Sequence, residues 1–219
     1  MWNPHEPLSA RQRQLLGALG IGLLLAIWSA IAASGKVRPY FLPAPWDVAD
    51  GIVYMANSKF ADQQLLPAAL ASMKRVGLAA ALVVLIGVPV GILMGASPKI
   101  NAVLSPLVDP MRSAPVVAIL PIIVLWFGVG EKSKIVFLYC GASVFLIPMT
   151  RDAIASVPQQ YVELARDLGA TPWETIRHAV IPLALPRILD AVIVAVSIEW
   201  TYITVAEYVN AEVGLGQLM

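Results

Sequence analysis

Long runs of uncharged, mostly apolar residues alternate along this chain with polar segments. Four runs cover residues 15–33, 76–96, 114–130 and 135–149, and a fifth, 183–205, is also apolar but contains Arg187, Asp190 and Glu199. A helix needs about 20 mostly apolar residues to cross a bilayer core about 30 Å thick. The pattern therefore predicts five membrane-spanning helices.

Composition agrees with that pattern and excludes other classes of protein. Of 219 residues, 58% are hydrophobic and 13% are charged, whereas a soluble domain is about 45–50% apolar and about 25% charged. The net charge of +1 provides no basic surface for nucleic acid, and the single Cys140 allows neither an internal disulfide nor a thiolate metal cage. We expect one all-α, polytopic membrane domain over residues 1–219.

The first run has two interpretations. Arg11 and Arg13 precede it, as in a secretory signal peptide. Its 19 uncharged residues exceed the usual h-region of about 7–15, which favours an uncleaved helix. With the N-terminus inside, eight Lys and Arg residues fall in inner segments and seven in outer ones, a count that permits this orientation.

The polar segment at about 151–182 carries helix start and stop signals. Pro158 suits the first turn of a helix and Gly169 suits the position after its end, which predicts a helix over 158–168. Thr171 and Glu174 match a capping box, with Pro172 at the first helical position, and predict a second helix over 172–180.

The first of these helices has an apolar stripe at helical spacing, formed by Tyr161, Leu164, Ala165 and Leu168. Isolated helices this short are marginal in water, so each needs something to pack against. One interpretation is a re-entrant hairpin lying on its own bundle. The other is a short helix presented to a soluble cytoplasmic partner.

The same segment resembles the EAA loop of ABC-importer permeases. That motif reads E-A-A, three residues, G, nine residues, I-x-L-P, and Glu163, Ala165, Gly169 and Pro182 have its spacing. The sequence departs from it by apolar-for-apolar changes at Leu164, Ala179 and Ile181.

The resemblance covers most of the chain from about Pro39 and is to the taurine, sulfonate, nitrate and bicarbonate branch of these permeases. Its motifs occur in order: Phe41-Leu42-Pro43-Ala44-Pro45, Val88-Pro89-Val90-Gly91, Arg112-x-x-Pro115, Leu120-Pro121, Trp126-Phe127-Gly128-Val129-Gly130, Ala206-Glu207 and Gly214-Leu215-Gly216. Each motif is weak alone, but their number, order and spacing make a strong signal.

The resemblance implies a type I ABC-importer permease fold in the bacterial inner membrane. Its partners would be a second copy of the permease, two cytoplasmic ATP-binding subunits, an extracytoplasmic solute-binding protein and the lipid bilayer, with no nucleic acid. The solute would be small, an anion such as a sulfonate, taurine, nitrate or bicarbonate. A sixth span would follow the five runs beyond residue 219.

The resemblance also implies that residues about 151–182 form the loop that couples the permease to its ATPase. The implied coupling residues are Glu163, Leu164, Ala165, Asp167, Leu168, Gly169, Ala170, Thr171, Pro172, Trp173 and Pro182. ATP and Mg would bind in the partner subunit, because this chain has no G-x-x-x-x-G-K-[ST] motif. We predict that the chain is not an enzyme and has no catalytic, cofactor-binding or metal-binding residues of its own.

Ionisable residues inside the fifth run are candidates for function because they are costly in lipid. Arg187 and Asp190 are three residues apart, so they can pair on a helix. A polar strip on one broad side of that helix provides the candidates for the translocation path: Glu199, Tyr202, Thr204 and Glu207. These four residues can equally serve interhelical hydrogen bonds, and an acidic strip is an awkward lining for an anion path.

Two other functions are compatible with parts of the sequence. A secondary transporter driven by an ion gradient would use Glu199 and Glu207 as proton-coupling carboxylates, and it leaves the capped loop unexplained. A membrane-embedded hydrolase is the weakest alternative, because the only histidines are His5 and His178.

Overall fold

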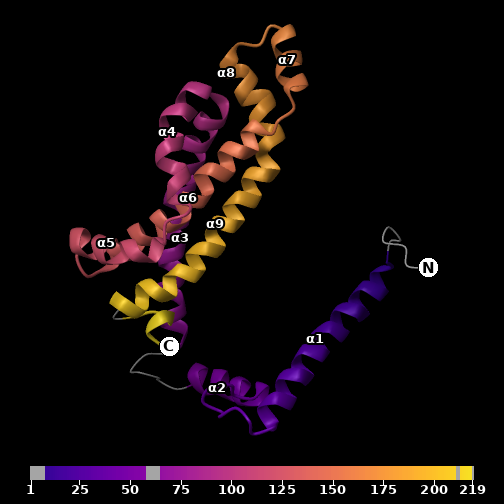
Figure 1. Cartoon of the computed structure of the whole chain (residues 1–219), viewed down its shortest axis with the longest axis vertical. Helices are drawn as coiled ribbons and strands as arrows, with labels where there is room; N and C mark the ends of the chain where they lie inside the picture. Colours follow the sequence, from indigo (N-terminus) through magenta and orange to yellow (C-terminus); the bar gives the residue numbers. More distant parts are fainter. Residues whose placement is uncertain (1–7, 58–64, 211–212, 219) are drawn as a thin grey trace. The chain divides into compact units, whose positions relative to one another are not determined.

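The computed structural model describes residues 8–57, 65–210 and 213–218 (Figure 1). Every regular element in these ranges is a helix. Contacts divide the chain into two units, residues 1–64 and 65–219, and each is described by itself. Within the described ranges, four helices are long and apolar enough to cross a membrane, or five if one bent pair is counted as a span.

The first unit consists of α1 (Ala10–Ala33) and α2 (Pro45–Asn57). Ser9 begins α1 through a capping box with Gln12, and the indole N–H of Trp28 donates to the carbonyl of Pro43 at 2.9 Å, joining α1 to the loop before α2. The helix expected at 15–33 is therefore present and begins five residues earlier. No residue of α1 is buried within the chain.

The second unit is built on α3 (Leu65–Ala96), α6 (Glu131–Ala155) and α9 (Ile181–Asn210). In Figure 1, α3 and α6 run in the same direction and α9 returns beside them. Glycines let α3 approach α6 closely: a Cβ on Gly91 would lie 2.5 Å from the Thr150 Cβ, and one on Gly95 would lie 2.6 Å from the Arg151 carbonyl oxygen. The runs expected at 76–96, 135–149 and 183–205 lie within these helices.

The run at 114–130 does not form one spanning helix, which corrects the sequence prediction. The chain instead forms α4 (Pro98–Met111), a 3₁₀ turn η1 (Val116–Ile119) and the eight-residue α5 (Leu120–Phe127), with a 94° bend across the break. Prolines explain the break, because Pro115 disfavours a helical conformation at Ala114 and lacks an N–H to continue the helix. The return between α3 and α6 is therefore the bent pair of α4 and α5.

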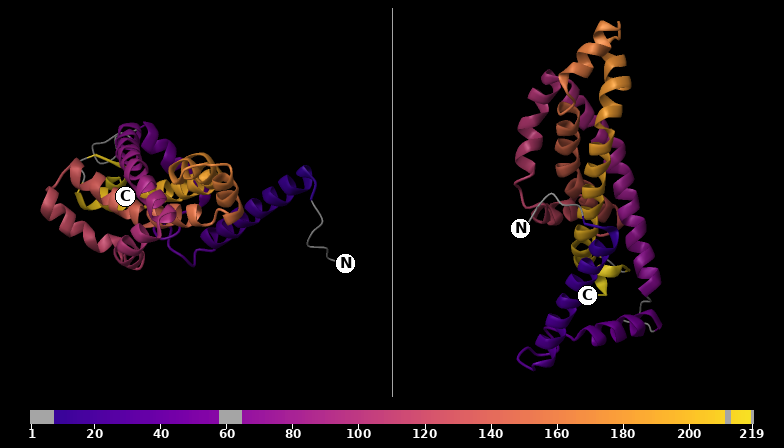
Figure 2. Two further views of the ribbon diagram at one scale, coloured as in Figure 1. Left: turned by 90° about the horizontal axis from the view of Figure 1, so that it is seen from above. Right: turned by 90° about the vertical axis from the view of Figure 1, so that its right-hand side faces the viewer.

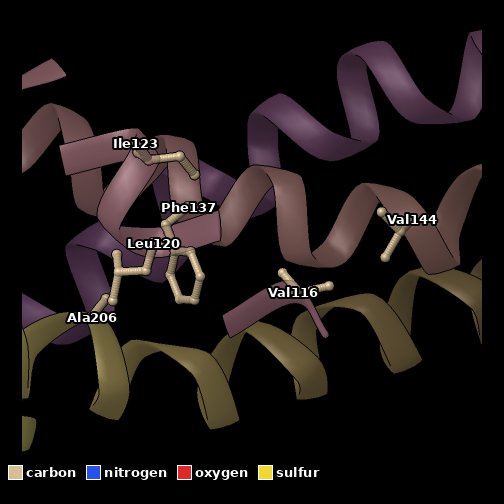
Figure 3. Close-up of a cluster of buried hydrophobic side chains, with 6 residues drawn as sticks. All are labelled: Val116, Leu120, Ile123, Phe137, Val144 and Ala206. Atoms are coloured by element: carbon tan, nitrogen blue, oxygen red, sulfur yellow. The ribbon is translucent and has the colours of Figure 1, made fainter. Parts of the chain in front are cut away.

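The bent segment is fixed by a buried apolar cluster (Figure 3). Val116, Leu120 and Ile123 of the η1–α5 segment pack with α6 and α9. The ring of Phe137 is fully buried in this cluster, and the remaining members are Val144 and Ala206. Burying a large apolar side chain contributes about 1.5–3 kcal/mol, so this cluster holds the break in place.

Short helices lie at the two ends of the second unit. A helical hairpin, α7 (Gln159–Asp167) and α8 (Pro172–Thr175), joins α6 to α9 at one end, and a π turn η2 (Ile176–Val180) connects α8 to α9. A 3₁₀ turn η3 (Leu215–Gln217) follows α9 and packs against it at the other end. Both views in Figure 2 show the second unit, and the right-hand view shows α4 lying along α6. We call these two ends the hairpin end and the opposite end.

Candidate functional site

The turn between α7 and α8 is made by Gly169. The helix ends with the Leu168 N–H donating to Leu164 O at 3.1 Å and the Gly169 N–H donating to Arg166 O at 2.8 Å. Gly169 has φ +86°, a left-handed conformation that L side chains rarely adopt. The helix predicted at 158–168 and its glycine stop are thus confirmed to within one residue at each end.

The start of α8 is the predicted capping box. The hydroxyl oxygen of Thr171 accepts the Glu174 N–H at 3.3 Å, and the Glu174 carboxylate accepts the Thr171 N–H at 2.8 Å. These two hydrogen bonds satisfy backbone N–H donors at the start of the helix and need no contact with any other part of the protein. The local sequence alone therefore stiffens this corner of the hairpin.

The second helix does not end at Val180, so Pro182 does not break it. The Ile181 N–H donates to Ile176 O, five residues earlier, and the chain continues into α9. Proline removes a donor and crowds the preceding turn, and a π turn is one of the adjustments that accommodates it inside a continuous helix. The hairpin is therefore joined rigidly to a spanning helix that extends from Pro172 to Val209.

The hairpin exposes large apolar side chains. Leu168 is 80% exposed and Trp173 is 61% exposed, while Leu164 and Tyr161 are also exposed. Val162 and Ala165 are half-buried, and Val162 helps to line a cavity of about 350 Å³ between the hairpin and the ends of α3 and α6. Only part of the predicted stripe thus faces the bundle, and the largest side chains do not.

The other predicted coupling residues lie on the same hairpin. Ala170 is half-buried like Ala165. The remaining members are exposed: Glu163, Asp167, Gly169, Thr171, Pro172 and Pro182. The segment therefore gathers every predicted coupling residue except Pro182 into α7, α8 and the turn between them.

At the opposite end, Glu207 is fully buried and fully engaged. Its carboxylate accepts the Ser72 hydroxyl at 2.7 and 2.8 Å, Arg75 Nη1 at 2.6 Å and the Gly216 N–H at 2.9 Å. Such charge-assisted bonds are among the strong ones in proteins. The acid therefore fastens α9 to α3 and to the turn that follows it.

The Gly-Leu-Gly turn folds directly onto this carboxylate. A Cβ on Gly214 would overlap the Glu207 carboxyl group, and a Cβ on Gly216 would overlap the Thr204 carbonyl oxygen. The Leu215 N–H also donates to the Ser72 hydroxyl at 3.0 Å. The spacing of Ala206-Glu207 and Gly214-Leu215-Gly216 is thus explained by a contact that only glycine allows.

The Glu207 network extends to a second acid. Arg75 also donates from Nε and Nη2 to the two Glu131 carboxylate oxygens, both at 2.7 Å, and Lys134 Nζ donates to Glu131 at 2.8 Å. Arg75 and Lys134 are buried. We name Ser72, Arg75, Glu131, Lys134 and Glu207 the closed cluster.

This cluster could not be predicted from the sequence. Arg75 and Glu207 are 132 residues apart, so no local pattern joins them. The one usable signal was the presence of opposite charges at the ends of three predicted spans.

Glu199 lies in a different environment from Glu207. It is fully buried on α9, and neither of its carboxylate oxygens has a hydrogen-bond partner among the described residues. Tyr202 packs its ring against Phe137 at 5.7 Å between centroids, and the Thr204 hydroxyl donates to the Thr201 carbonyl of its own helix. The four candidates for the translocation path therefore do not form one polar strip.

Arg187 and Asp190 do not form the expected pair. Both side chains are exposed, and no ion pair within 4.0 Å joins them in the described part of the chain. The loss of side-chain entropy on forming an exposed ion pair is about as large as the electrostatic energy gained, so such a pair adds little stability.

A third group of charges lies between α4 and α6 near the hairpin end. Arg151 Nη1 donates to Asp109 at 2.8 Å, and Arg151 Nε donates to Asp152 at 2.9 Å. These residues help to line a polar pocket of about 490 Å³. No group of three or more His, Cys, Asp and Glu side chains suited to a metal ion occurs in residues 8–57, 65–210 and 213–218.

Comparison with known proteins agrees with the helical arrangement and the motifs. Residues 87–219, more than half of the chain, match the family model for binding-protein-dependent transport system inner membrane components. The taurine transport system permease protein TauC of Escherichia coli is 35% identical over 214 residues, covering 96% of this chain and 76% of its own. SsuC of Bacillus subtilis, an aliphatic sulfonates transport permease by name, is 29% identical over 98% of this chain and 76% of its own.

A solved structure shares the fold. The inward-facing MetNI methionine ABC transporter contains a chain that is 28% identical and superposes with a TM-score of 0.59, over 67% of this chain and 74% of that chain. ATP hydrolysis in such systems belongs to a separate subunit, so this chain is not the enzyme. Its motifs, its helices and these similarities together place the chain in the family of inner-membrane permease components of binding-protein-dependent ABC importers.

Proposed function

We propose that this chain is a type I importer permease that acts as a pair of copies and couples to two cytoplasmic ATPase subunits through the hairpin at 158–182. The observation that carries the proposal is the exposure of Leu168 and Trp173 on a hairpin whose turn is fixed by Gly169 and by the Thr171–Glu174 capping box. Large exposed apolar groups on a stiff projection mark a protein contact site. The same interpretation puts the hairpin end in the cytoplasm.

The continuity from α8 into α9 supports a lever in this proposal. A displacement of α8 by the ATPase would pass into the spanning helix without a flexible link, because η2 and α9 follow α8 with no break. Gly169 supplies the sharp turn, and the Thr171–Glu174 box keeps the turn from unwinding. A loop without these features would dissipate the movement.

The solute we propose is a small sulfonate or taurine, delivered by an external binding protein. The support is the 35% identity with a taurine permease and the lower identity with a permease named for aliphatic sulfonates. The proton-coupled alternative loses one of its two carboxylates, because the contacts of Glu207 in the closed cluster hold α3, α9 and η3 together. Glu199, its other carboxylate, is buried without a hydrogen-bond partner among the described residues.

The docking proposal is tested by co-purification of this chain with its ATPase from a membrane extract. Leu168→Glu places a charge on an 80%-exposed apolar site and should reduce the recovered ATPase by at least about tenfold, since burying an unpaired charge at an interface costs more than about 1.4 kcal/mol. Gln160→Glu adds the same charge to an exposed polar position of α7 and should have no effect. Equal recovery with the two variants would refute the docking site.

A further inference from the structure

The polar pocket near the hairpin end is formed by one face of α4 opposite α6. Asn101, Ser105 and Asp109 follow one another at intervals of four residues on α4, so they share a face of that helix, and all three line the pocket. The other face of α4 exposes Val103 and Leu107. Polar side chains in a membrane bundle face its interior or a water-filled cavity, and solute pathways are among the sites they form.

Arg151 is the only cation among the described residues that line this pocket, and its hydrogen-bonding capacity is partly unused. A guanidinium has five N–H donors. Here Nε is bonded to Asp152 and Nη1 to Asp109, whereas the Nη2 donors have no acceptor among the described residues. The arginine side chain is 16% exposed, but the two aspartates are 46% and 58% exposed. Both signs of charge are therefore available to a molecule in the pocket.

The charge balance selects the ligand. Two aspartates against one arginine give the described lining residues a formal charge of −1. A simple anion is repelled by this net negative charge. A simple cation binds the aspartates but leaves the free N–H donors of Arg151 without an acceptor. A molecule that carries an ammonium and an oxyanion satisfies both signs. Asn101, which also lines the pocket, has a buried Oδ1 with no partner among the described residues.

We propose that this pocket binds a small zwitterion, with its sulfonate or carboxylate on Arg151 and its ammonium on Asp109 and Asp152. The volume of about 490 Å³ is within the usual range of ligand pockets, about 300–1,000 Å³. The inference rests on the proposed function, because it gives the permease itself a solute site. The acidic residues that make the pocket unsuitable for a simple anion are the ones that make it selective.

The competing explanation is that the Arg151 ion pairs only tie α4 to α6. A tie of that kind would affect stability and would show no preference among ligands. The distinction therefore requires probes that carry one charged group or both. Taurine and β-alanine carry both, ethanesulfonate carries only the anion, and ethylammonium carries only the cation.

The test measures equilibrium binding of these four probes to the permease–ATPase complex in lipid nanodiscs without binding protein. Each charge-assisted contact is worth roughly tenfold or more in affinity, so at least one zwitterion should bind at least about tenfold more tightly than ethanesulfonate and ethylammonium. Asp152→Asn should remove most of that advantage without weakening ethanesulfonate. Lys99→Gln removes an exposed charge from α4 outside the pocket and should change nothing.

Arg151→Gln should abolish the oxyanion contribution, and Asp152→Asn keeps the test valid if that variant does not fold. The proposal is overturned if neither zwitterion binds more tightly than its single-charge analogues, or if Asp152→Asn behaves as Lys99→Gln does. ATP hydrolysis stimulated by loaded binding protein is measured on the same complex. If loaded binding protein stimulates ATP hydrolysis but no zwitterion binds, this inference alone is overturned. If loaded binding protein does not stimulate ATP hydrolysis by the unmodified complex, the proposed function is overturned.

Discussion

Two arginines organise the charges of the second unit, one at each end, and they are used in opposite ways. Arg75 is buried and donates from all three of its nitrogens, to Glu131, Glu207 and the Val213 carbonyl. Arg151 donates from two nitrogens to aspartates that are about half exposed, beside an open pocket. Arg75 uses four of its five N–H donors in bonds to protein groups, whereas Arg151 uses two of five.

The difference separates a structural network from a site that can accept a ligand. The closed cluster joins α3, α6 and α9 and holds the turn at Gly214-Leu215-Gly216, and at its centre Arg75 and Glu207 are buried and bonded to protein groups. The Arg151 group joins only α4 and α6, with donors unused and acceptors exposed. A buried ion pair is costly to break, whereas an exposed one contributes little.

The largest effect is expected from breaking the closed cluster. Arg75→Gln leaves Glu207 buried without its cation and should reduce stability by about 3–5 kcal/mol. The readout is the melting temperature of the purified complex, with the exposed neighbour Lys74→Gln as the matched control. The double variant Arg75→Gln with Glu207→Gln should recover part of the loss, because no uncompensated charge remains. A single variant as stable as Lys74→Gln would remove the structural role of Arg75.

A smaller loss is expected from filling the space beside Glu207. Gly216→Ala places a Cβ against the Thr204 carbonyl and the Glu207 side chain, and overpacking of this kind costs about 1–3 kcal/mol. Gly77→Ala is the control, because nothing lies within 4 Å of its added Cβ, and it should stabilise α3 by about 0.5–1 kcal/mol. Melting temperatures that shift in the same direction for both variants would contradict the close contact.

The smallest effect on stability is expected at the Arg151 group. Asp109→Asn removes one pair whose members are 16% and 46% exposed, and such pairs contribute about 0.2–1 kcal/mol. The same melting experiment should therefore show a shift several times smaller than that of Arg75→Gln. A loss comparable to that of Arg75→Gln would mean that the Arg151 group is also a structural cluster.

Features that depend on neighbouring residues could be predicted from the sequence. Residues only a few positions apart determine the capping box of Thr171 and Glu174 and the helix stop at Gly169. The structure contains both features. The four long spans follow from hydropathy in the same way. The assignment of the hairpin residues to ATPase coupling is a separate claim and remains a proposal.

Features that depend on distant parts of the chain could not be predicted. Hydropathy cannot distinguish a straight span from the bent pair of α4 and α5, because the break is set by Pro115 and by packing of Val116 against α6 and α9. Nor could it separate Glu199 from Glu207, which occupy the same helix. Their roles diverge because Ser72 and Arg75 of α3 contact only one of them.

The turn of the hairpin provides the sharpest test of whether the hairpin transmits the ATPase movement. Gly169 and Gly35 both have positive φ, +86° and +68°, and open space around an added Cβ. Valine at either position therefore imposes similar backbone strain, of about 1–3 kcal/mol, but only Gly169 lies in the hairpin. The measurement is ATP hydrolysis by the reconstituted complex, with and without loaded binding protein. We predict that Gly169→Val loses most of the stimulated hydrolysis and that Gly35→Val retains it; full stimulation in Gly169→Val would contradict the account.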